Sequence, residues 1–375
     1  MTFRCLPFES VFADESGGNV KTPQAEYLSQ GEFPVVDQGK ALIGGYTDRS
    51  ERLCGQGQSA IVFGDHTRCI KYIDFPFCMG ADGVKVLRPK IEADLKYLYH
   101  FLKSLDIPSA GYDRHYKYLK RIEVLLPPFP EQRRIAAILD QADALRAKRR
   151  EALAQLDSLT QSIFIEMFGD PVANPLGWPE TLKLGAAADI VSGVTKGRKI
   201  GDLPTRIVPY LAVANVQDKA LSLAGVKMIE ASESEIWRYR LLRNDLLLTE
   251  GGDPDKLGRG TLWNDEMPEC IHQNHIFRVR LTDAAVLPLF LNWLVGSARG
   301  KKYFLRSAKQ TTGIASINMT QLREFPLLLP PMALQQSFAS RVQSVEFLKA
   351  KHRAALAELD ALFASLQHRA FAGTL

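Results

Sequence analysis

The sequence has few cysteines, no long apolar run and little excess charge. Its five cysteines among 375 residues form no Cys-x-x-Cys pair, which argues against a zinc ribbon and favours a reducing compartment. No run of about 18 apolar residues occurs, so no membrane span is expected. The first residues also lack the basic and then apolar pattern of a signal peptide. We therefore expect a cytoplasmic protein.

The composition is that of an ordinary globular protein. Hydrophobic residues make up 46% and charged residues 24% of the chain, which excludes a disordered protein. The net charge of +5 permits nucleic-acid binding without requiring it. A chain of 375 residues is too long for one simple core, so two or more domains are expected.

What the chain does have is an internal repeat. Residues 119–168 recur in outline at 322–371, with an offset of 322 − 119 = 203 that is also kept at the proline pairs, 330 − 127 = 203. Each copy reads as a short strand, a Pro-Pro stop and one long charged helix, because proline cannot continue a strand ladder. A duplicated frame with two divergent inserts suggests a protein that reads two different things at a fixed distance.

The helix of each copy has an apolar stripe at three- and four-residue steps, which predicts a heptad-like seam. In the first copy the seam is Ile135, Ile138, Ala142, Leu145, Ala152, Leu156, Leu159 and Ile163. In the second copy it is Phe338, Val345, Leu348, Ala355, Leu359, Leu362 and Leu366. Each helix is too long to stand alone, so we predict that the two pair with each other, antiparallel.

These patterns predict an α/β (α+β) protein with two pseudo-repeated domains joined by two long antiparallel coiled-coil helices. The predicted parts are a first domain (1–129), a central long helix (130–169), a second domain (170–331) and a C-terminal long helix (332–375). Both domains show a helix (91–105 and 289–305), a glycine loop, a strand and Pro-Pro in the same order, so we expect them to share a fold.

At these residues the chain resembles the specificity subunit of a type I restriction-modification system. The resemblance rests on "LLPPFPEQRRIAAILDQADALRAKRR" (125–150), "LLLPPMALQQ" (327–336), "GWPETLKLGAAADIVSG" (177–193) and "VVDQG…GGY" (35–46). It implies two target-recognition domains, each reading one half of a bipartite site in double-stranded DNA. It further implies that the helices set the spacing and dock two methyltransferase (modification) subunits.

The resemblance also implies a subunit with no catalytic activity and no cofactor of its own. S-adenosylmethionine, ATP and Mg are then expected in the partner subunits, including restriction/translocase subunits where a system has them. One departure concerns the second copy, which has Met332-Ala333-Leu334 in place of Phe129-Pro130-Glu131. The start of the second helix is therefore less well specified.

Three motifs could suggest catalysis, and each has a simpler interpretation. Leu126-Pro127-Pro128-Phe129 superficially resembles an adenine-methyltransferase loop, but leucine cannot accept a hydrogen bond from the target amino group. Asp253-Pro254-Asp255-Lys256 reads as a turn and not as a nuclease site. His272 and His275, near Cys270, would face opposite sides of a strand. A stand-alone DNA-modifying enzyme and a coiled-coil interaction protein remain as alternatives.

DNA reading needs arginine or lysine for guanine, asparagine or glutamine for adenine, and basic or hydroxyl groups for phosphates. The candidates in the first domain are Gln38, Tyr46, Arg49, Arg52, Lys71, Gly111, Tyr112, Arg114 and His115. Those in the second domain are Thr195, Lys196, Arg198, Lys199, Asn215, Lys256, Arg259, Gln273, Asn274, Lys309, Gln310, Thr312 and Gly313. Gly111 and Gly313 would offer backbone contacts, because a glycine loop recurs in both halves.

Two basic clusters, "RAKRR" (146–150) and "KAKHR" (349–353), lie at equivalent points of the repeat. They form either a solvated face or a contact surface for phosphates or partner subunits. The candidate partner-binding residues are Gln132, Arg146, Arg149, Arg150, Gln335, Lys349, Lys351 and Arg353. Arg149 and His352 fall on the apolar seam, where a polar residue can fix the register of a helix pair.

Overall fold

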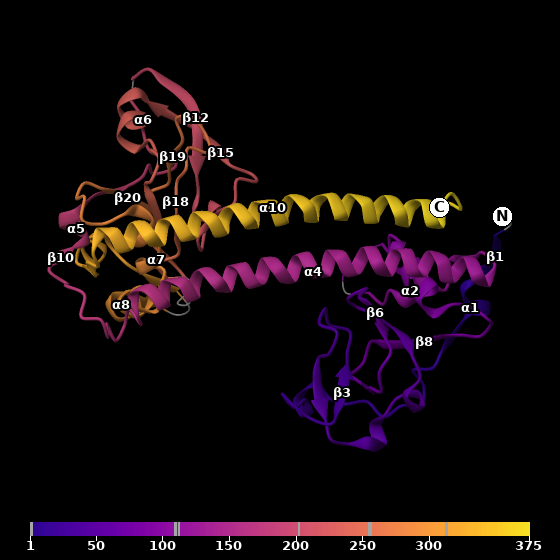
Figure 1. Ribbon diagram of the computed structural model, residues 1–375. Helices are drawn as coiled ribbons and strands as arrows, with labels where there is room; N and C mark the ends of the chain where they lie inside the picture. The colour runs from indigo at the N-terminus through magenta and orange to yellow at the C-terminus, as the bar shows by residue number, and fades with distance from the viewer. Residues whose placement is uncertain (1–2, 109–110, 112, 202, 254–256, 312–313) are drawn as a thin grey trace. The chain divides into compact units, whose positions relative to one another are not determined.

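The computed structural model describes residues 3–108, 111, 113–201, 203–253, 257–311 and 314–375. The chain forms two compact units (Figure 1). Unit 1 comprises residues 1–152 and 352–375, and unit 2 comprises residues 153–351. Each unit is therefore built from segments of both long helices.

In the described residues, unit 1 combines a two-stranded, a four-stranded and a three-stranded sheet with short helices. Its amino-terminal strand β1 (Arg4–Pro7) pairs antiparallel with β9 (Glu123–Leu126), the strand that precedes Pro-Pro. The four-stranded sheet has the order β2 (Phe12–Asp14), β8 (Val84–Pro89), β5 (Ala60–Gly64), β6 (Ile70–Ile73). The three-stranded sheet has the order β4 (Gly45–Thr47), β3 (Phe33–Val36), β7 (Cys78–Met79). The helices are α1 (Phe8–Val11), α2 (Leu95–Ser104) and α3 (Tyr116–Leu119), with 3₁₀ turns at Gln24–Glu26, Ser50–Arg52 and Gly55–Gly57.

Unit 2 repeats this topology with strands of different lengths. β10 (Leu182–Lys183) pairs antiparallel with β23 (Pro326–Leu327). The four-stranded sheet has the order β11 (Ala188–Ser192), β20 (Ile276–Leu281), β16 (Leu246–Thr249), β18 (Gly260–Leu262). The three-stranded sheet has the order β15 (Lys227–Ser232), β12 (Thr205–Leu211), β19 (Ile271–His272). The parallel pair β12–β19 corresponds to the parallel pair β3–β7 of unit 1. The predicted shared fold is thus confirmed.

Unit 2 also contains further short elements. Its strands β13 (Val216–Gln217) and β14 (Ala220–Leu221) pair with each other, and β17 (Gly251–Gly252), β22 (Ile314–Ser316) and β21 (Lys309–Thr311) form a small sheet. Its helices are α5 (Leu184–Ala187), α6 (Glu233–Tyr239), α7 (Pro288–Val295), α8 (Ala298–Ser307) and α9 (Met319–Arg323), with a 3₁₀ turn at Val213–Asn215.

The prediction of one helix over 289–305 was wrong, because the chain breaks between α7 and α8. The Ser297 hydroxyl donates to the Leu294 carbonyl at 2.6 Å and so competes with the helical hydrogen bonds at this point. Gly300 allows the two helices to approach closely, because a Cβ atom there would lie 1.8 Å from the Val295 carbonyl oxygen. A local hydrogen bond and a steric requirement therefore both explain why the helix is broken here.

The two long helices have the same limits within the repeat. α4 runs from Phe129 to Phe168 and α10 from Met332 to Phe371, 40 residues each. Each helix is about 60 Å long at 1.5 Å per residue. The limits differ by 332 − 129 = 203 and 371 − 168 = 203, the offset of the sequence repeat. The departure at 332–334 therefore does not shift the start of the second helix.

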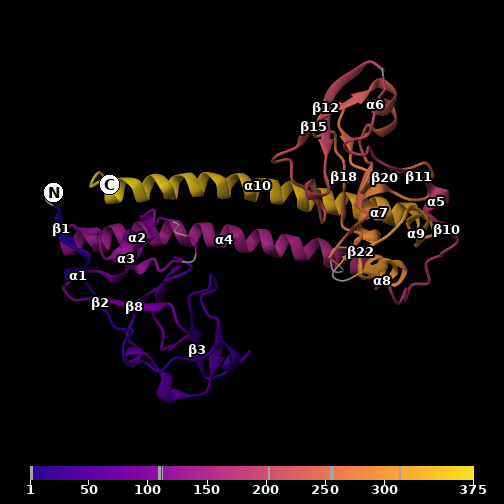
Figure 2. The ribbon, with the colours of Figure 1, turned by 180° about the vertical axis from the view of Figure 1, so that it is seen from behind.

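Within each unit the segments of α4 and α10 run antiparallel (Figures 1 and 2). In unit 1 Arg146 of α4 contacts Asp360 of α10. In unit 2 Asp157 contacts Lys349, and the later Glu166 contacts the earlier Arg341. The predicted antiparallel pairing is thus confirmed.

The predicted seam was only partly right. Ile135, Ala142 and Ile163 are buried, but four leucines of the seam, Leu145, Leu159, Leu348 and Leu362, are 44–50% exposed. Other apolar residues of the long helices are buried instead, among them Leu139 of α4 and Val342 of α10. A straight helix of 3.6 residues per turn drifts by about 20° per heptad, so a seven-residue pattern leaves the contact line.

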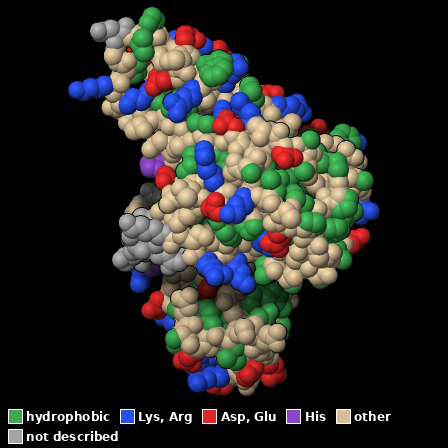
Figure 3. Space-filling model, turned by 90° about the vertical axis from the view of Figure 1, so that its left-hand side faces the viewer, with side chains coloured by type: hydrophobic (Ala, Val, Ile, Leu, Met, Phe, Trp, Pro, Cys, Tyr) green, Lys and Arg blue, Asp and Glu red, His purple; other side chains and the backbone are tan. Residues whose placement is uncertain are grey.

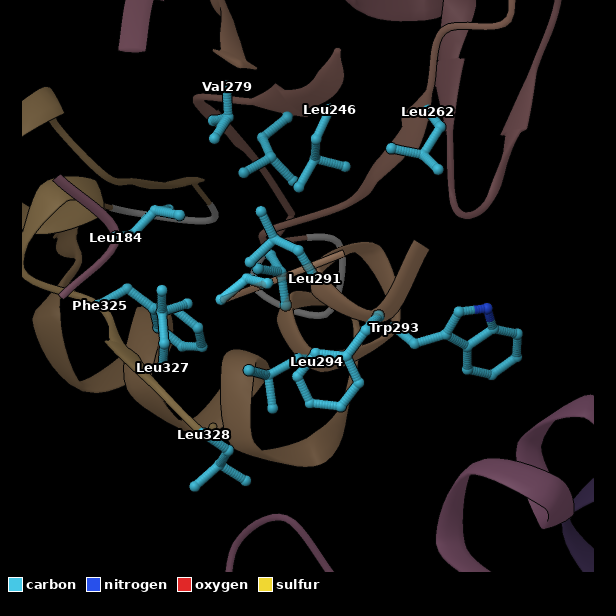
Figure 4. Packing of buried hydrophobic residues seen from close by; sticks show 14 of the residues in the cluster. Leu184, Leu246, Leu262, Val279, Leu291, Trp293, Leu294, Phe325, Leu327 and Leu328 are labelled. Atoms are coloured by element: carbon cyan, nitrogen blue, oxygen red, sulfur yellow. The ribbon is translucent and has the colours of Figure 1, made fainter. Parts of the chain in front are cut away.

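A shared core fixes each pair of helix segments to its own unit. In unit 2, Phe164 of α4 packs against Phe338 of α10 with ring centroids 5.6 Å apart, and against Phe290 and Trp293 of α7 at 6.1 Å. The same core continues through Leu294, Phe325 and Leu327 to the sheet (Figure 4). In the part of the chain that the structure describes, no helix is both long and apolar enough to cross a membrane.

Candidate nucleic-acid interface

Two buried glutamines join the Pro-Pro stop, the long helix and a preceding helix in each unit. The Gln132 amide donates to the Pro127 carbonyl at 2.8 Å and its oxygen accepts from the Asp94 N–H at 2.9 Å. Asp94 is the N-cap of α2. Both ends of the Gln132 carboxamide are therefore used inside unit 1, where the side chain is buried.

Gln335 makes the equivalent contacts in unit 2. Its amide donates to the Pro330 carbonyl at 2.9 Å and its oxygen accepts from the Leu287 N–H at 2.8 Å. Leu287 is the N-cap of α7, as Asp94 is of α2. Because Gln132 and Gln335 are fully buried, the structure gives them a positioning role and leaves them out of any partner surface.

In unit 2 two loops that the sequence separates by about 80 residues lie side by side. The first follows β11 (193–201) and the second joins β19 to β20 (273–275), and we call them the loop pair of unit 2. Val194 donates to the His272 carbonyl at 2.8 Å and accepts from the Asn274 N–H at 3.1 Å. Gly193 is required here, because a Cβ atom would lie 2.0 Å from the His272 carbonyl oxygen.

Arg198 holds the first of these loops in place. Its guanidinium donates to both carboxylate oxygens of Glu235 at 2.5 and 2.6 Å and to the Glu230 carbonyl at 3.1 Å. Such two-pronged pairs are strong and directional, and this one keeps the pKa of Glu235 below its ordinary value. The predicted base reader Arg198 is therefore engaged within the chain.

The loop pair of unit 2 presents several of the other predicted residues together. Thr195, Lys196 and Lys199 are exposed, and Gln273 and Asn274 are partly buried beside them. The Gln273 oxygen accepts from the Val213 N–H at 3.3 Å, which orients its side chain. A fixed loop with lysine, threonine and amide side chains can contact both phosphates and base edges.

On one face of the molecule the described lysine and arginine side chains form no continuous basic patch. On the face drawn in Figure 3, lysine and arginine side chains alternate with acidic and apolar ones. This distribution agrees with the small net charge of +5. It favours contact through particular loops over a broad electrostatic attraction.

Unit 1 brings the equivalent loops together. The loop after β2 (16–21) lies beside the loop between β7 and β8 (80–83), and Thr22 donates to the Met79 carbonyl at 2.9 Å. These segments, the loop pair of unit 1, line a cavity of about 330 Å³. Arg114 also lines it, and the Gln38 amide donates to the Asp82 carbonyl at 3.3 Å, so the structure places both of these predicted residues at the loop pair.

Other charged residues at this cavity were not predicted from the sequence. Lys21 pairs with Asp82, and Lys85 pairs with Asp14 at 2.7 Å. Hydrogen bonding to Lys21 lowers the pKa of Asp82. The sequence contains a signal for this loop, because "SGGNVK" (16–21) comes shortly after β2 and the similar "SGVTK" (192–196) begins at the last residue of β11.

Most of the other candidates of unit 1 are used within the fold. Arg52 is buried and pairs with Glu26 at 2.9 Å, with Arg49 near the same carboxylate at 3.7 Å. Buried Lys71 donates to the Asp37 carbonyl at 2.7 Å. His115 Nδ1 is hydrogen-bonded to the Asp65 carbonyl oxygen at 2.8 Å. Gln38 Oε1 accepts from the His66 N–H at 3.2 Å. Tyr46 pairs with Pro34 between two strands. Burial removes Arg52, Lys71 and His115 from the surface proposed below.

Some of the remaining candidates have contacts within the fold, whereas others are exposed or lie outside the described residues. Asn215 is buried, and its side chain bonds Ala212 and Ser222 at 2.8 Å. Arg259 donates to Gln217 at 3.2 Å. Gly111 is exposed with a φ of +64°, a left-handed conformation that favours glycine. Tyr112, Lys256, Thr312 and Gly313 lie outside the described residues, as do the side chains of Lys309 and Gln310.

His272 and His275 do not act together. His272 is fully buried, with Nδ1 3.0 Å from the Ile276 carbonyl oxygen, and burial lowers its pKa to about 4. His275 is exposed and lies 2.6 Å from Glu250. Among the described residues no group of three or more histidine, cysteine or acidic side chains forms a metal-binding cluster.

The basic clusters of the long helices lie at the contact between the helices. Arg146 donates to Asp360 at 2.6 Å, and Arg150 reaches the same carboxylate at 3.1 Å. Lys349 is buried and pairs with Asp157 at 2.8 Å. The other three candidate partner residues here are exposed: Arg149, Lys351 and Arg353.

Comparison with known proteins agrees with this architecture. Residues 14–155 match the family described as the type I restriction modification DNA specificity domain. The StySPI specificity subunit of Salmonella potsdam is 24% identical over 77% of this chain and 67% of its own length. The EcoKI specificity subunit of Escherichia coli K12 is 27% identical over 44% of this chain and 37% of its own length.

Two solved structures share the fold at low sequence identity. The type I restriction-modification S subunit from M. genitalium has a TM-score of 0.59 at 15% identity, covering 99% of this chain and 96% of that one. A chain from a study of type I complex assembly has a TM-score of 0.56 at 17% identity, covering 100% and 98%. Residues 14–155 thus match the type I specificity domain, and the chain is similar in sequence to specificity subunits of type I restriction-modification systems and shares the fold of the two solved structures.

Proposed function

We propose that each unit of this specificity subunit reads one half of a bipartite DNA site through its loop pair. The observation that supports this most is the recurrence of the loop pair at the same place in both units, with different side chains. The unit 2 pair presents Thr195, Lys196, Gln273 and Asn274. The charged residues that line the unit 1 cavity include Lys21, Asp82, Lys85 and Arg114. Equal scaffolds with unequal side chains suit the reading of two different half-sites.

The proposal assigns different tasks to different side chains. Lys196 and Lys199 would contact phosphates, because an exposed ammonium is a mobile point charge. Asn274 can bond adenine through both amide atoms, and Gln273, whose oxygen accepts from the Val213 N–H, can donate to a base through its amide nitrogen. In unit 1, Arg114 can donate to guanine or to phosphate, and Lys21 and Lys85 can exchange their carboxylate partners for phosphates.

The helices α4 and α10 would set the unread spacer and dock two methyltransferase subunits. A helix of about 60 Å corresponds in length to about 18 base pairs at 3.4 Å each. A specificity subunit recognises DNA and is not itself a catalyst. Methyl transfer from S-adenosylmethionine, and cleavage with ATP and Mg, would therefore belong to partner subunits.

A methylome tests this function. The chain is expressed with its methyltransferase in a host without DNA methylation, and modified bases are mapped by long-read sequencing. We expect a new asymmetric motif with two short half-sites and a fixed gap, lost when the chain is omitted. If both proteins are present and no motif appears, the alternative of a coiled-coil interaction protein is favoured. A motif produced by the chain alone would instead indicate a stand-alone DNA-modifying enzyme.

The spacer role has its own test. Because the two helices pair antiparallel, residues 148–154 and their repeat equivalents 351–357 should be deleted together. Seven residues remove about 10 Å, so we expect the unread spacer to shorten by about three base pairs while both half-sites stay the same. A spacer that keeps its length in a folded double deletion contradicts the role of the helices.

A further inference from the structure

Each unit exposes apolar side chains beside its interhelical ion pair. In unit 1, Leu145 is 45% and Leu362 50% exposed, and they lie one and two residues from the ion pair Arg146–Asp360. We call Ala144, Leu145 and Leu362 patch 1. The two leucines come from both helices beside one ion pair, and exposed apolar side chains on a helix pair can be covered by a partner protein.

Unit 2 repeats this arrangement at the equivalent positions. Leu348 is 45% and Leu159 44% exposed, one and two residues from the ion pair Lys349–Asp157. The offsets 348 − 145 = 203 and 362 − 159 = 203 are those of the repeat. We call Phe347, Leu348 and Leu159 patch 2. Two surfaces of the same design suit two copies of one protein, the methyltransferase subunit of the function proposed above.

The two patches differ at one prominent position. Phe347 of patch 2 is 60% exposed, and Lys351 lies over its ring at 4.5 Å from the centroid. The repeat equivalent in patch 1 is Ala144, because 347 − 203 = 144. Aromatic side chains are frequent anchors of protein interfaces, whereas alanine offers little surface to bury.

We infer that the two copies of the partner bind with unequal affinity, and that the first copy binds at patch 2. Phe347 supplies an anchor there that patch 1 lacks. This inference rests on the docking role proposed for the long helices, and it adds that the two copies of the partner bind in a fixed order. Loss of one anchoring ring from an interface typically weakens binding by about tenfold to a hundredfold.

The test is a titration of the methyltransferase into the full-length chain, followed by native mass spectrometry. For the wild-type chain we expect the 1:1 complex to accumulate before the 2:1 complex. At one equivalent of partner, hydrogen exchange should slow in residues 344–351 before it slows in residues 141–148. Phe347→Ala should bring the ratio of the two stepwise dissociation constants close to about fourfold, the statistical value for two equal and independent sites.

The repeat supplies a reciprocal variant and a control. Ala144→Phe should strengthen the weaker step and also bring the two steps together, without loss of the first. Gln343→Ala changes an exposed residue of α10 outside both patches and should leave both steps unchanged. Unchanged step ratios in both Phe347→Ala and Ala144→Phe overturn the inference. A methyltransferase that fails to bind the folded wild-type chain contradicts the docking role itself.

Discussion

Arg149 and His352 occupy the same position in the two copies of the repeat, and they contact each other. Arg149 Nη1 lies 3.2 Å from His352 Nδ1, and 352 − 149 = 203. When equivalent residues of two antiparallel helices meet, the residues on either side of them pair reciprocally. Arg146 therefore pairs with Asp360, and their repeat equivalents Lys349 and Asp157 pair in the other unit.

This reciprocity predicts similar coupling in the two ion pairs. Asp360 and Asp157 are 43% and 67% exposed, so solvent screens both pairs and each should contribute about 0.5–1 kcal/mol. Double-mutant cycles to alanine, measured by urea unfolding, should give this coupling for Arg146 with Asp360 and for Lys349 with Asp157. Lys349→Arg, which copies the residue of the other helix, should cost less than about 0.5 kcal/mol. Absence of coupling in either cycle contradicts the reciprocal pairing.

The buried glutamines should each stabilise their own unit. Gln132→Ala leaves the Pro127 carbonyl and the Asp94 N–H without their partner, which should lower the free energy of unfolding by about 2–4 kcal/mol. Gln335→Ala should have a similar effect in unit 2. The neighbouring exposed residues provide controls, Arg133→Ala and Gln336→Ala, and should stay within about 0.5 kcal/mol of the wild type. If a glutamine variant and its control lose the same free energy of unfolding, the buried glutamine has no special role in stability.

The lysines of the unit 2 loop pair should act on DNA through charge. Lys196→Ala and Lys199→Ala should weaken binding to every DNA sequence alike, and each should reduce the slope of log K against log salt by about 1. The measurement is the DNA affinity of the assembled complex at several salt concentrations. Lys302→Ala is a matched control, because this exposed lysine of α8 belongs to neither loop. A slope that remains unchanged in both loop variants would exclude phosphate contacts by these lysines.

The stability of unit 2 should depend on pH through His272. Burial lowers the pKa of His272 to about 4 from an ordinary 6.5. Between these values the unfolded chain binds a proton that the folded chain does not, so the free energy of unfolding falls as the pH decreases. The loss should reach about 3 kcal/mol below pH 4. In a nuclear magnetic resonance titration His272 should remain neutral at pH 5, and His272→Asn should remove this part of the pH dependence. His275→Asn, at the exposed histidine, should retain it.

The fold was largely predictable because the repeat constrains it strongly. Proline pairs at 127 and 330, and apolar residues at helical spacing, predicted two long antiparallel helices whose observed limits differ by the same 203 residues. The break between α7 and α8 was not predicted, because it depends on the side-chain bond of Ser297 and the close approach at Gly300. Such tertiary requirements leave no periodic signal.

The candidate site was predicted less well than the fold. Composition singled out Arg198 and Lys71 as DNA readers, but both are engaged with acidic or carbonyl groups of the chain itself. Sequence shows residue type and not burial, so it cannot separate an anchoring arginine from a reading one. The adjacency of 193–201 to 273–275 arises from one bridge between Val194 and Gln273. A contact over that sequence distance is set by the sheet and not by local sequence.

The central claim is that each unit reads its own half-site through its loop pair. The most direct test is to compare the methylomes of two loop-pair variants, Asn274→Ala in unit 2 and Arg114→Ala in unit 1, each expressed with the methyltransferase. We predict that each variant relaxes the recognised sequence in one half-site only, that the two variants affect opposite halves, and that the spacer stays constant. Variants that alter the same half-site, or that alter both halves together, would contradict the claim.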